Sequence, residues 1–354
     1  MYDPFSRGSF PVGVRAIVAE DKERSRTFPI EIWYPAAPRH LGQDLVPETQ
    51  DVSAAPPRNE PRAQMAVRDA AANPGRYPLI VYSHHSGGNR RSATFLSTHL
   101  SSHGYVVAAL DHSEAVASDL KPREGESAEA RAARAEAMIA SRVPDVRFLL
   151  DRMFSAMWDS EASLDPTQIG IVGHSFGGWT ALAAPEVEPR IQALGALAPA
   201  GASNPRPGIL RATLTFRWGR DVPAMYLVAE NDVPLPLSGM YELFERTPGT
   251  KRMAILRRAD HLHFIDNIEE EHEALRNMPL TGREGEWMLK EMRPASELCS
   301  GETAHAFVRG LTLCHFDAAL SRQQDAQEFL SGNIEAELAK RDIPAYLYDG
   351  SARK

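Results

Sequence analysis

A serine flanked by glycines stands where an apolar stretch gives way to a helical pattern. The segment IGIVGHSFGG at 169–178 places Gly173, Ser175 and Gly177 in the pattern G-x-S-x-G. This pattern is typical of a nucleophile elbow, a sharp turn between a strand and a helix that lifts the serine hydroxyl clear of the sheet. Larger side chains would collide in so tight a turn, so small residues are needed on both sides. The spacing predicts Ser175 as a nucleophile for acyl chemistry.

The base and the acid that such a serine needs are found later in the chain. A serine hydroxyl is a weak nucleophile at neutral pH, so a histidine must accept its proton and a carboxylate must orient that histidine. Glu230 and Asp232 directly follow one apolar strand, and His261 and His263 follow the next. Asp232 is the candidate acid, with Glu230 in reserve. Either histidine could be the base, because a spacing of two places both on one side of an extended chain.

Backbone N–H groups must hold the oxyanion that forms when a serine attacks a carbonyl. One normally belongs to the residue after the nucleophile, here Phe176. The second is expected from the loop SHHSGG at 83–88, whose glycines let the backbone approach closely, and Ser86 is the candidate donor. His84 and His85 are expected to support this loop or line the pocket rather than bind a metal, because no zinc-like ligand spacing accompanies them.

Strands and helices alternate along most of the chain, which predicts the α/β class, a mostly parallel sheet flanked by helices that opens with an antiparallel pair. Eight strands are predicted, at residues 12–18, 28–34, 79–82, 105–110, 168–172, 191–197, 224–229 and 252–256. The longer helical patterns lie at 92–103, 127–154, 176–184, 237–246, 304–320 and 324–340. Pro144 is expected to break the second of these helices in two.

One domain spanning 1–354 is expected, elaborated at three places. Residues 36–76 are rich in proline and are expected to form a surface insertion with one short helix at 63–72. Residues 113–143 form a candidate helical cap. Residues 276–354 are expected to form a helical C-terminal extension.

The composition excludes several classes of protein. The 354 residues are 43% hydrophobic and 24% charged, which are ordinary globular proportions, and the net charge of −8 leaves no basic footprint for nucleic acid. No stretch approaches the roughly 20 apolar residues that span a bilayer. No signal-like segment opens the chain, so a cytoplasmic location is expected, or secretion if a leader has been removed. Cys299 and Cys314 are expected to be buried thiols.

Four segments are similar to those of one known family. They are IEIWYP at 30–35, YPLIVYSHHSGG through SSHGYVVAALDH across 77–112, the elbow GHSFGG at 173–178, and HLHFID at 261–266. In these segments the chain resembles α/β-hydrolases of the dienelactone hydrolase superfamily, in the branch of platelet-activating-factor acetylhydrolase-like esterases. The resemblance covers about residues 12–267 and implies an α/β-hydrolase fold.

The resemblance also implies roles for individual residues. The histidine loop of that family commonly reads H-x-x-F-x-D, which favours His261 over His263. The residue after an SHG-like segment donates an oxyanion N–H, which corresponds to Ser86, although the glycine of that segment is His85 here. No acid follows the strand after the elbow helix, where such acetylhydrolases can carry one. This supports Asp232, whose position is similar to that of the acid in dienelactone hydrolases.

Together these features predict a serine esterase, a carboxylesterase with a catalytic triad. It would hydrolyse a small-molecule ester with a short acyl group through an acyl-serine intermediate, without metal or cofactor. The same triad would serve a lactone or amide hydrolase or an acyltransferase. A non-catalytic binding protein on a hydrolase scaffold is the alternative from another class, and the complete set Ser175, Asp232 and His261 argues against it.

Overall fold

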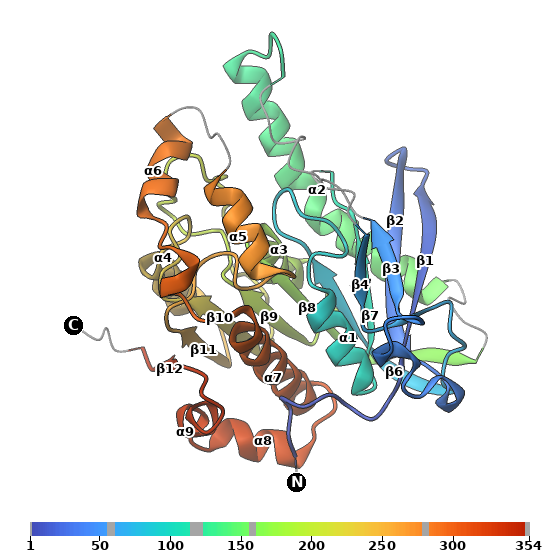
Figure 1. Cartoon of the computed structure of the whole chain (residues 1–354). Coiled ribbons are helices and arrows are strands. Elements are labelled where there is room, and N and C mark those ends of the chain that lie inside the picture. The colour runs from blue at the N-terminus through green and yellow to red at the C-terminus, as the bar shows by residue number, and fades with distance from the viewer. Residues whose placement is uncertain (1, 55–60, 114–122, 156–160, 278–282, 351–354) are drawn as a thin grey trace. The chain divides into compact units, whose positions relative to one another are not determined.

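The computed structural model describes the chain except for residues 1, 55–60, 114–122, 156–160, 278–282 and 351–354 (Figure 1). Parts of the expected insertion, cap and extension therefore lie outside the described residues. The chain forms two compact units. The N-terminal unit consists of Arg7–Val172 and Glu188–Gln192, and the C-terminal unit consists of Met1–Ser6, Gly173–Val187 and Ala193–Lys354.

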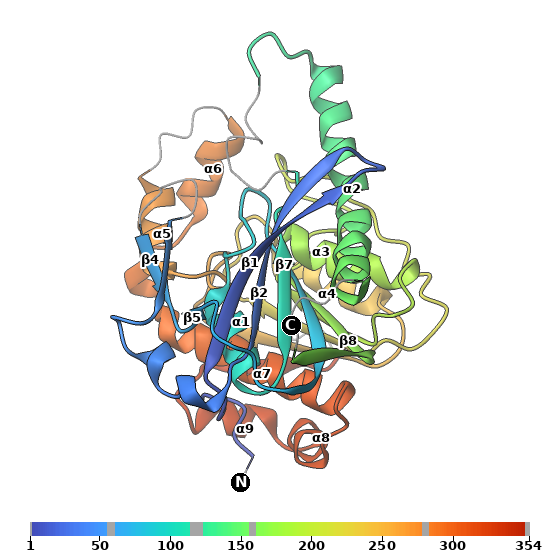
Figure 2. The ribbon, with the colours of Figure 1, turned by 90° about the vertical axis from the view of Figure 1, so that its right-hand side faces the viewer.

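The strands of the N-terminal unit lie in the order β8-β6-β7-β2-β1-β5. β1 (Val12–Asp21) and β2 (Arg26–Pro35) pair antiparallel, which confirms the opening pair (Figure 2). β7 (Val106–Leu110) is antiparallel to β2 and parallel to β6 (Gly75–Ser83). β7 is buried along its whole length, as the apolar run VVAAL predicts for a strand covered on both faces. The remaining strands are β5 (Val67–Arg68) and β8 (Ala162–His174).

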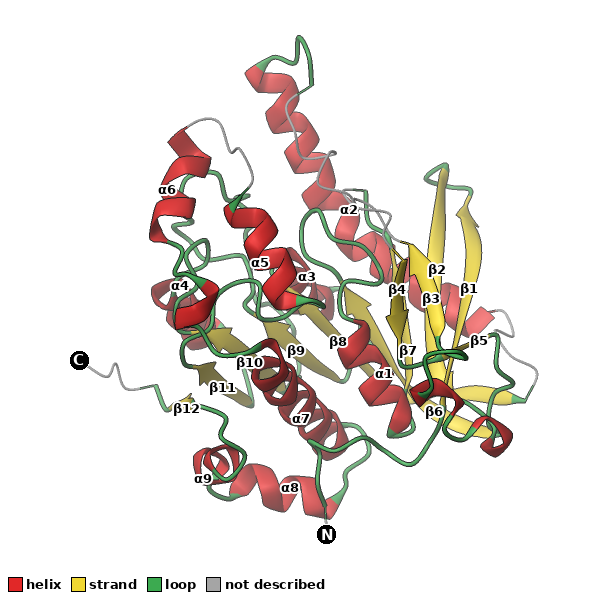
Figure 3. Ribbon diagram, viewed as in Figure 1, coloured by secondary structure: helices red, strands yellow, loops and turns green. Residues whose placement is uncertain are grey.

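The described part of this unit contains two α-helices, α1 (Thr94–Ser102) and α2 (Ala128–Ser155). α2 runs unbroken through Pro144, so the predicted break is wrong (Figure 3). A proline inside a helix removes a backbone hydrogen bond and costs about 3 kcal/mol or more. The helix continues because its neighbours on either side of the proline, Arg142 and Asp145, are buried and bound to other parts of the unit.

The expected insertion folds into short elements: η1 (Pro38–His40), η2 (Gln43–Leu45) and a hairpin of β3 (Asp51–Ala54) with β4 (Pro61–Gln64). The short helix expected at 63–72 is wrong, because this stretch contributes to β4 and β5. The Asp51 carboxylate accepts hydrogen bonds from Gln64 at 2.7 Å and from Arg68 at 2.8 and 2.7 Å. These contacts with a distant strand outweigh the local helical pattern.

The strands of the C-terminal unit lie in the order β12-β11-β10-β9. β9 (Ala193–Leu197), β10 (Ala224–Ala229) and β11 (Lys251–Leu256) are parallel, and β12 (Ala345–Tyr348) joins β11 antiparallel. Without the separate pair β3 and β4, the described residues contain ten strands, whereas eight were predicted. The two additions, β5 and β12, are too short for a sequence pattern to reveal.

The helices of this unit are α3 (Phe176–Ala183), η4 (Ala184–Glu186), α4 (Leu237–Arg246), α5 (Ile268–Arg276), α6 (Arg283–Glu291), η5 (Ala295–Glu297), α7 (Gly301–Ala319), α8 (Gln324–Ser331) and α9 (Ile334–Ala339). The helix predicted at 324–340 is therefore two helices. The Asn333 side chain accepts a hydrogen bond from the Ala336 N–H at 2.9 Å and caps the second of them. Cys299 and Cys314 are free and buried, as expected. Within the described ranges, every helix is too short or too polar to cross a membrane.

Candidate active site

Ser175 occupies a strained turn between β8 and α3. Its backbone angles are φ 58° and ψ −115°, a region that a non-glycine residue adopts at a cost of about 1–3 kcal/mol. Two backbone hydrogen bonds hold the turn, from the Ser175 N–H to the Leu197 carbonyl at 2.8 Å and from the Ala200 N–H to the Ser175 carbonyl at 2.9 Å. The G-x-S-x-G segment therefore folds as a strand, a sharp turn and a helix, with a half-buried serine at the turn.

The last glycine of the elbow segment is required by packing. A Cβ atom on Gly178 would lie 2.8 Å from the Cα of Pro199 and 3.2 Å from the carbonyl oxygen of Gly173. Backbone atoms cannot move aside as the end of a flexible side chain can. Only glycine therefore lets α3 lie this close to the segment that follows β9.

Three of the predicted site residues form a continuous hydrogen-bonded chain within the C-terminal unit. His261 Nε2 lies 2.9 Å from Ser175 Oγ, and His261 Nδ1 lies 2.7 Å from Asp232 Oδ2. Asp232 follows β10 and His261 follows β11, and these parallel strands end at the same edge. Because the carboxylate accepts from Nδ1–H, Nε2 remains as the acceptor for the serine hydroxyl. This arrangement can remove the serine proton during attack on a carbonyl.

The acid and the base of this chain are held by their surroundings. The Asp232 side chain is only 1% exposed, and its Oδ1 accepts a hydrogen bond from the Leu235 N–H at 2.7 Å. The ring of His174 packs against two others, with its centroid 4.7 Å from that of His261 and 5.4 Å from that of Phe264. His174 was not predicted as a site residue, because in the sequence nothing beyond its place before the serine marks it as a support for the base.

The Asp232 carboxylate raises the basicity of its partner. Burial by itself lowers the pKa of His261, but the charges of Asp232 and Asp260 outweigh burial and raise the pKa above its ordinary 6.5. Burial raises the pKa of Asp232, and His261 opposes that shift. A histidine with a raised pKa keeps its proton to higher pH.

We expect kcat/KM for a neutral ester to rise with pH along a limb whose midpoint lies above 6.5. Only neutral His261 can accept the serine proton, and its raised pKa moves that form to higher pH. Rates measured from about pH 5 to about pH 9, corrected for spontaneous hydrolysis, check this expectation. A limb centred below the ordinary histidine value would contradict it.

The two reserve residues make other contacts. His263 Nδ1 lies 2.8 Å from Asp260 Oδ1, and its Nε2 lies 3.2 Å from the Cys299 carbonyl oxygen. Burial lowers the pKa of His263, but these contacts raise it to about 10, so the ring holds its proton at neutral pH. The Glu230 carboxylate accepts a hydrogen bond from the Arg258 N–H at 3.1 Å. The geometry thus favours His261 over His263 as the base, and Asp232 over Glu230 as the acid.

The two candidate oxyanion donors belong to different units. Phe176 is the first residue of α3, which places its N–H at the positive end of the helix. Ser86 lies in a turn of the N-terminal unit, in which the Gly88 N–H donates to the His85 carbonyl at 3.1 Å and Gly87 has φ 76°. A positive φ at the third position is typical of a type II turn, and such a turn does not use the N–H of its second residue, here Ser86.

The histidines of this loop are engaged within the unit. The His84 Nδ1–H donates to the His85 carbonyl at 2.6 Å, and its Nε2 accepts from the His112 N–H at 3.0 Å. The ring of His85 lies over Gly88, where a Cβ atom would come within 2.4 Å of it. Across the described part of the chain, no group of three or more His, Cys, Asp or Glu side chains could hold a metal ion.

Comparison with known proteins finds similarity to esterases. Residues 60–145 match the family model of platelet-activating factor acetylhydrolase, isoform II. The platelet-activating factor acetylhydrolase of Canis lupus familiaris is 28% identical over an alignment of 142 residues, and the match covers 31% of this chain and 32% of that protein. The chain spans about a third of the length of this curated relative. These matches confirm the resemblance to the acetylhydrolase-like branch.

A solved structure confirms the fold. The ferulic acid esterase from Streptomyces cinnamoneus has a TM-score of 0.63 with this chain at 22% identity, covering 89% of this chain and 91% of the other. The chain therefore has the α/β-hydrolase fold that the resemblance implies.

Proposed function

We propose that the protein is a serine esterase that hydrolyses a carboxylic ester with a short acyl group. The observation that carries this proposal is the chain from Ser175 through His261 to Asp232, with hydrogen bonds of 2.9 and 2.7 Å. The similar proteins support it, because an acetylhydrolase and a ferulic acid esterase both cleave esters. The short acyl group is suggested by the acetylhydrolase likeness.

In the first half-reaction, His261 Nε2 takes the proton of Ser175 while Oγ attacks the carbonyl carbon of the ester. The carbonyl oxygen becomes an oxyanion, which we assign to the N–H groups of Phe176 and Ser86. The bond to the leaving oxygen then breaks, and His261 gives its proton to the departing alcohol. The acyl group remains on Ser175.

In the second half-reaction, His261 takes a proton from water while the water oxygen attacks the acyl carbon. Ser175 Oγ then leaves and recovers its proton from His261, which releases the acid. Asp232 stabilises the imidazolium in both halves. Every proton moves between these residues, the ester and water, so these steps need no cofactor.

We expect hydrolysis of p-nitrophenyl esters to fall by at least about 100-fold in kcat/KM between acetate and octanoate, because a site for short acyl groups excludes long chains. The Ser175→Ala variant measures the background. Constant or rising activity along the series would contradict the preference for a short acyl group, but it would not contradict the esterase function. If the wild-type protein neither hydrolyses the esters nor is labelled by a fluorophosphonate, the esterase proposal itself is contradicted. An added alcohol that accumulates as a new ester would reveal acyl transfer.

A further inference from the structure

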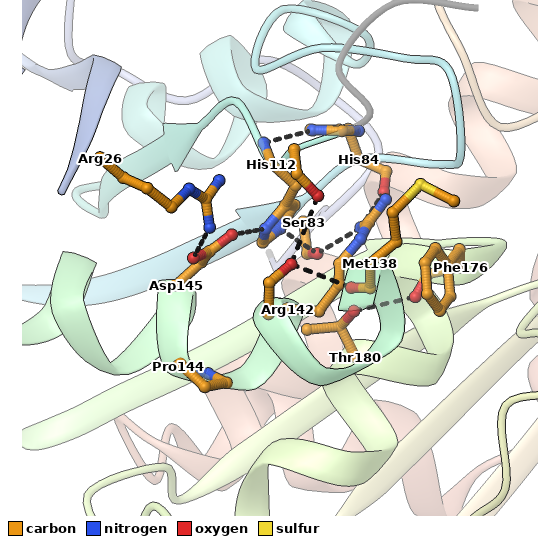
Figure 4. Close-up of polar contacts among 12 residues, drawn as sticks. Arg26, Ser83, His84, His112, Met138, Arg142, Pro144, Asp145, Phe176 and Thr180 are labelled. Atoms are coloured by element: carbon orange, nitrogen blue, oxygen red, sulfur yellow. Dashed lines mark hydrogen bonds and ion pairs between the residues drawn. The ribbon is translucent and has the colours of Figure 1, made fainter. Parts of the chain in front are cut away.

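A buried chain of polar side chains joins Ser83 to His112 and Asp145 within the N-terminal unit (Figure 4). Ser83 Oγ lies 3.0 Å from His112 Nε2, and His112 Nδ1 lies 2.9 Å from Asp145 Oδ2. These are the distances of a serine triad, yet Ser83 and Asp145 are 0% exposed, and Arg142 Nη1 lies 3.3 Å from Ser83 Oγ. An ester cannot reach a sealed hydroxyl, so this chain is no second active site.

The positions of the protons follow from the charged end of the chain. Burial raises the pKa of Asp145, but Arg24 and Arg26 each place Nη1 2.6 Å from its Oδ1 and oppose that shift, which stabilises the ionised carboxylate. That carboxylate accepts from the His112 Nδ1–H, so His112 Nε2 accepts from the Ser83 hydroxyl. Burial and the charge of Arg142 lower the pKa of His112 well below its ordinary value, which keeps the ring neutral. The Ser83 oxygen is therefore left to accept from Arg142.

Arg142 also contacts the backbone of the loop. It is fully buried in α2, and its Nη1 donates to the His84 carbonyl at 2.6 Å. The ring of His84 is held in turn by the His112 N–H, which donates to its Nε2 at 3.0 Å. Burial lowers the pKa of His84 well below its ordinary value, so the ring stays neutral with its proton on Nδ1. That proton is donated to the His85 carbonyl at 2.6 Å.

The His85 carbonyl and the Ser86 N–H belong to one peptide group. A trans peptide group is planar, so its C=O and N–H point in opposite directions. The His85 carbonyl is held from two sides, by the His84 ring at 2.6 Å and by the Gly88 N–H at 3.1 Å. Holding this carbonyl fixes the direction of the Ser86 N–H.

We propose that Arg142 and His84 are positioning residues for the Ser86 N–H, the group assigned above to the oxyanion, an inference that rests on the proposed esterase function. Arg142, in α2, contacts Ser83 and the His84 carbonyl. The His84 ring then holds the next peptide group through its hydrogen bond to the His85 carbonyl. A donor aimed in advance stabilises the oxyanion without reorganisation during the reaction. A guanidinium suits this role, because its planar fork has fixed directions whereas an ammonium rotates freely.

Arg142→Met tests the first of these residues. The change removes both contacts and keeps the site filled, while Asp145 retains Arg24 and Arg26. We expect kcat per active site to fall about 100-fold and KM to change less than about threefold, because a misdirected donor weakens the transition state more than the bound ester. Complete labelling with a fluorophosphonate counts the active sites, so loss of folded protein is not mistaken for loss of rate.

Arg26→Met is the matched control for that variant. It removes an arginine whose Nη1 lies 2.6 Å from Asp145, and this contact is with α2 and not with the loop. Arg26 is half-buried, whereas Arg142 is fully buried. We expect kcat per active site to stay within about twofold of the wild type, because Arg24 still neutralises Asp145.

His84→Leu and His84→Asn test the second residue by rescue. Leucine removes the donor to the His85 carbonyl, whereas the asparagine amide keeps an N–H near the place of Nδ1. We expect the leucine variant to lose about 100-fold in kcat and the asparagine variant to regain at least about tenfold of that loss. Affinity for a trifluoromethyl ketone, whose adduct with the serine is an oxyanion, should fall by the same factor as kcat/KM.

The outcomes separate the two proposals. If Arg142→Met is folded and matches the wild-type rate per active site, or if His84→Leu and His84→Asn lose equally, the positioning roles are overturned and the esterase stands. If Arg142→Met does not fold, the His84 pair decides. Absence of ester turnover by the wild type would overturn the proposed function together with this inference.

Discussion

Replacing Ser175 with alanine is expected to lower kcat for ester hydrolysis by about 10⁶-fold and to leave the fold intact. The variant retains the base and the oxyanion donors but has no oxygen to form the acyl intermediate. The elbow should survive, because the hydrogen bonds that hold it come from the backbone of residue 175 and not from its hydroxyl. Steady-state hydrolysis of p-nitrophenyl acetate measures the loss, and thermal unfolding with circular dichroism checks the fold.

Ser203→Ala is the control, since Ser203 lies in the same unit and its hydroxyl donates a hydrogen bond to Glu242 at the surface. It should keep wild-type activity and label with a fluorophosphonate, whereas Ser175→Ala should not label. A folded Ser175→Ala variant that retains more than about 1% of the wild-type rate would show that another group is the nucleophile.

Replacing Asp232 with asparagine is expected to cost about 10⁴-fold in kcat at neutral pH. The amide has the shape of the carboxylate, and its oxygen can still accept from the Leu235 N–H. It removes the negative charge that fixes the His261 tautomer and stabilises the imidazolium. The same charge raises the pKa of His261, so the acid limb of the pH profile should move to lower pH in the variant. Measuring kcat/KM against pH for both proteins tests the two effects together.

Glu230→Gln provides the matched control for this change, because Glu230 follows the same strand and its carboxylate accepts a hydrogen bond from the Arg258 backbone N–H. We expect it to keep activity within about twofold of the wild type. If Glu230→Gln instead shows the large loss and Asp232→Asn does not, the acid is Glu230. An unchanged acid limb in a folded Asp232→Asn variant would contradict the electrostatic role of Asp232.

Local patterns were reliable where adjacent residues already specify the type and order of the elements. The elbow at Ser175 is such a case, because a strand, a sharp turn and a helix follow directly from an apolar run, small residues and a helical pattern. Local patterns failed where distant contacts decide. Pro144 remains inside α2, and residues 63–72 contribute to β4 and β5 instead of forming a helix, because residues outside each segment bind it.

By itself, the sequence determined the α/β class, the nucleophile candidate Ser175 and the two loops that supply an acid and a histidine, since each follows from composition and from order along the chain. Only the tertiary structure decided which histidine faces the serine, because His261 and His263 share a loop and differ in what folds against them. It alone also joined Ser83 to His112 and Asp145, across 29 and 33 residues. No local pattern encodes such contacts, since they form only when the packing of strands and helices brings separate segments together.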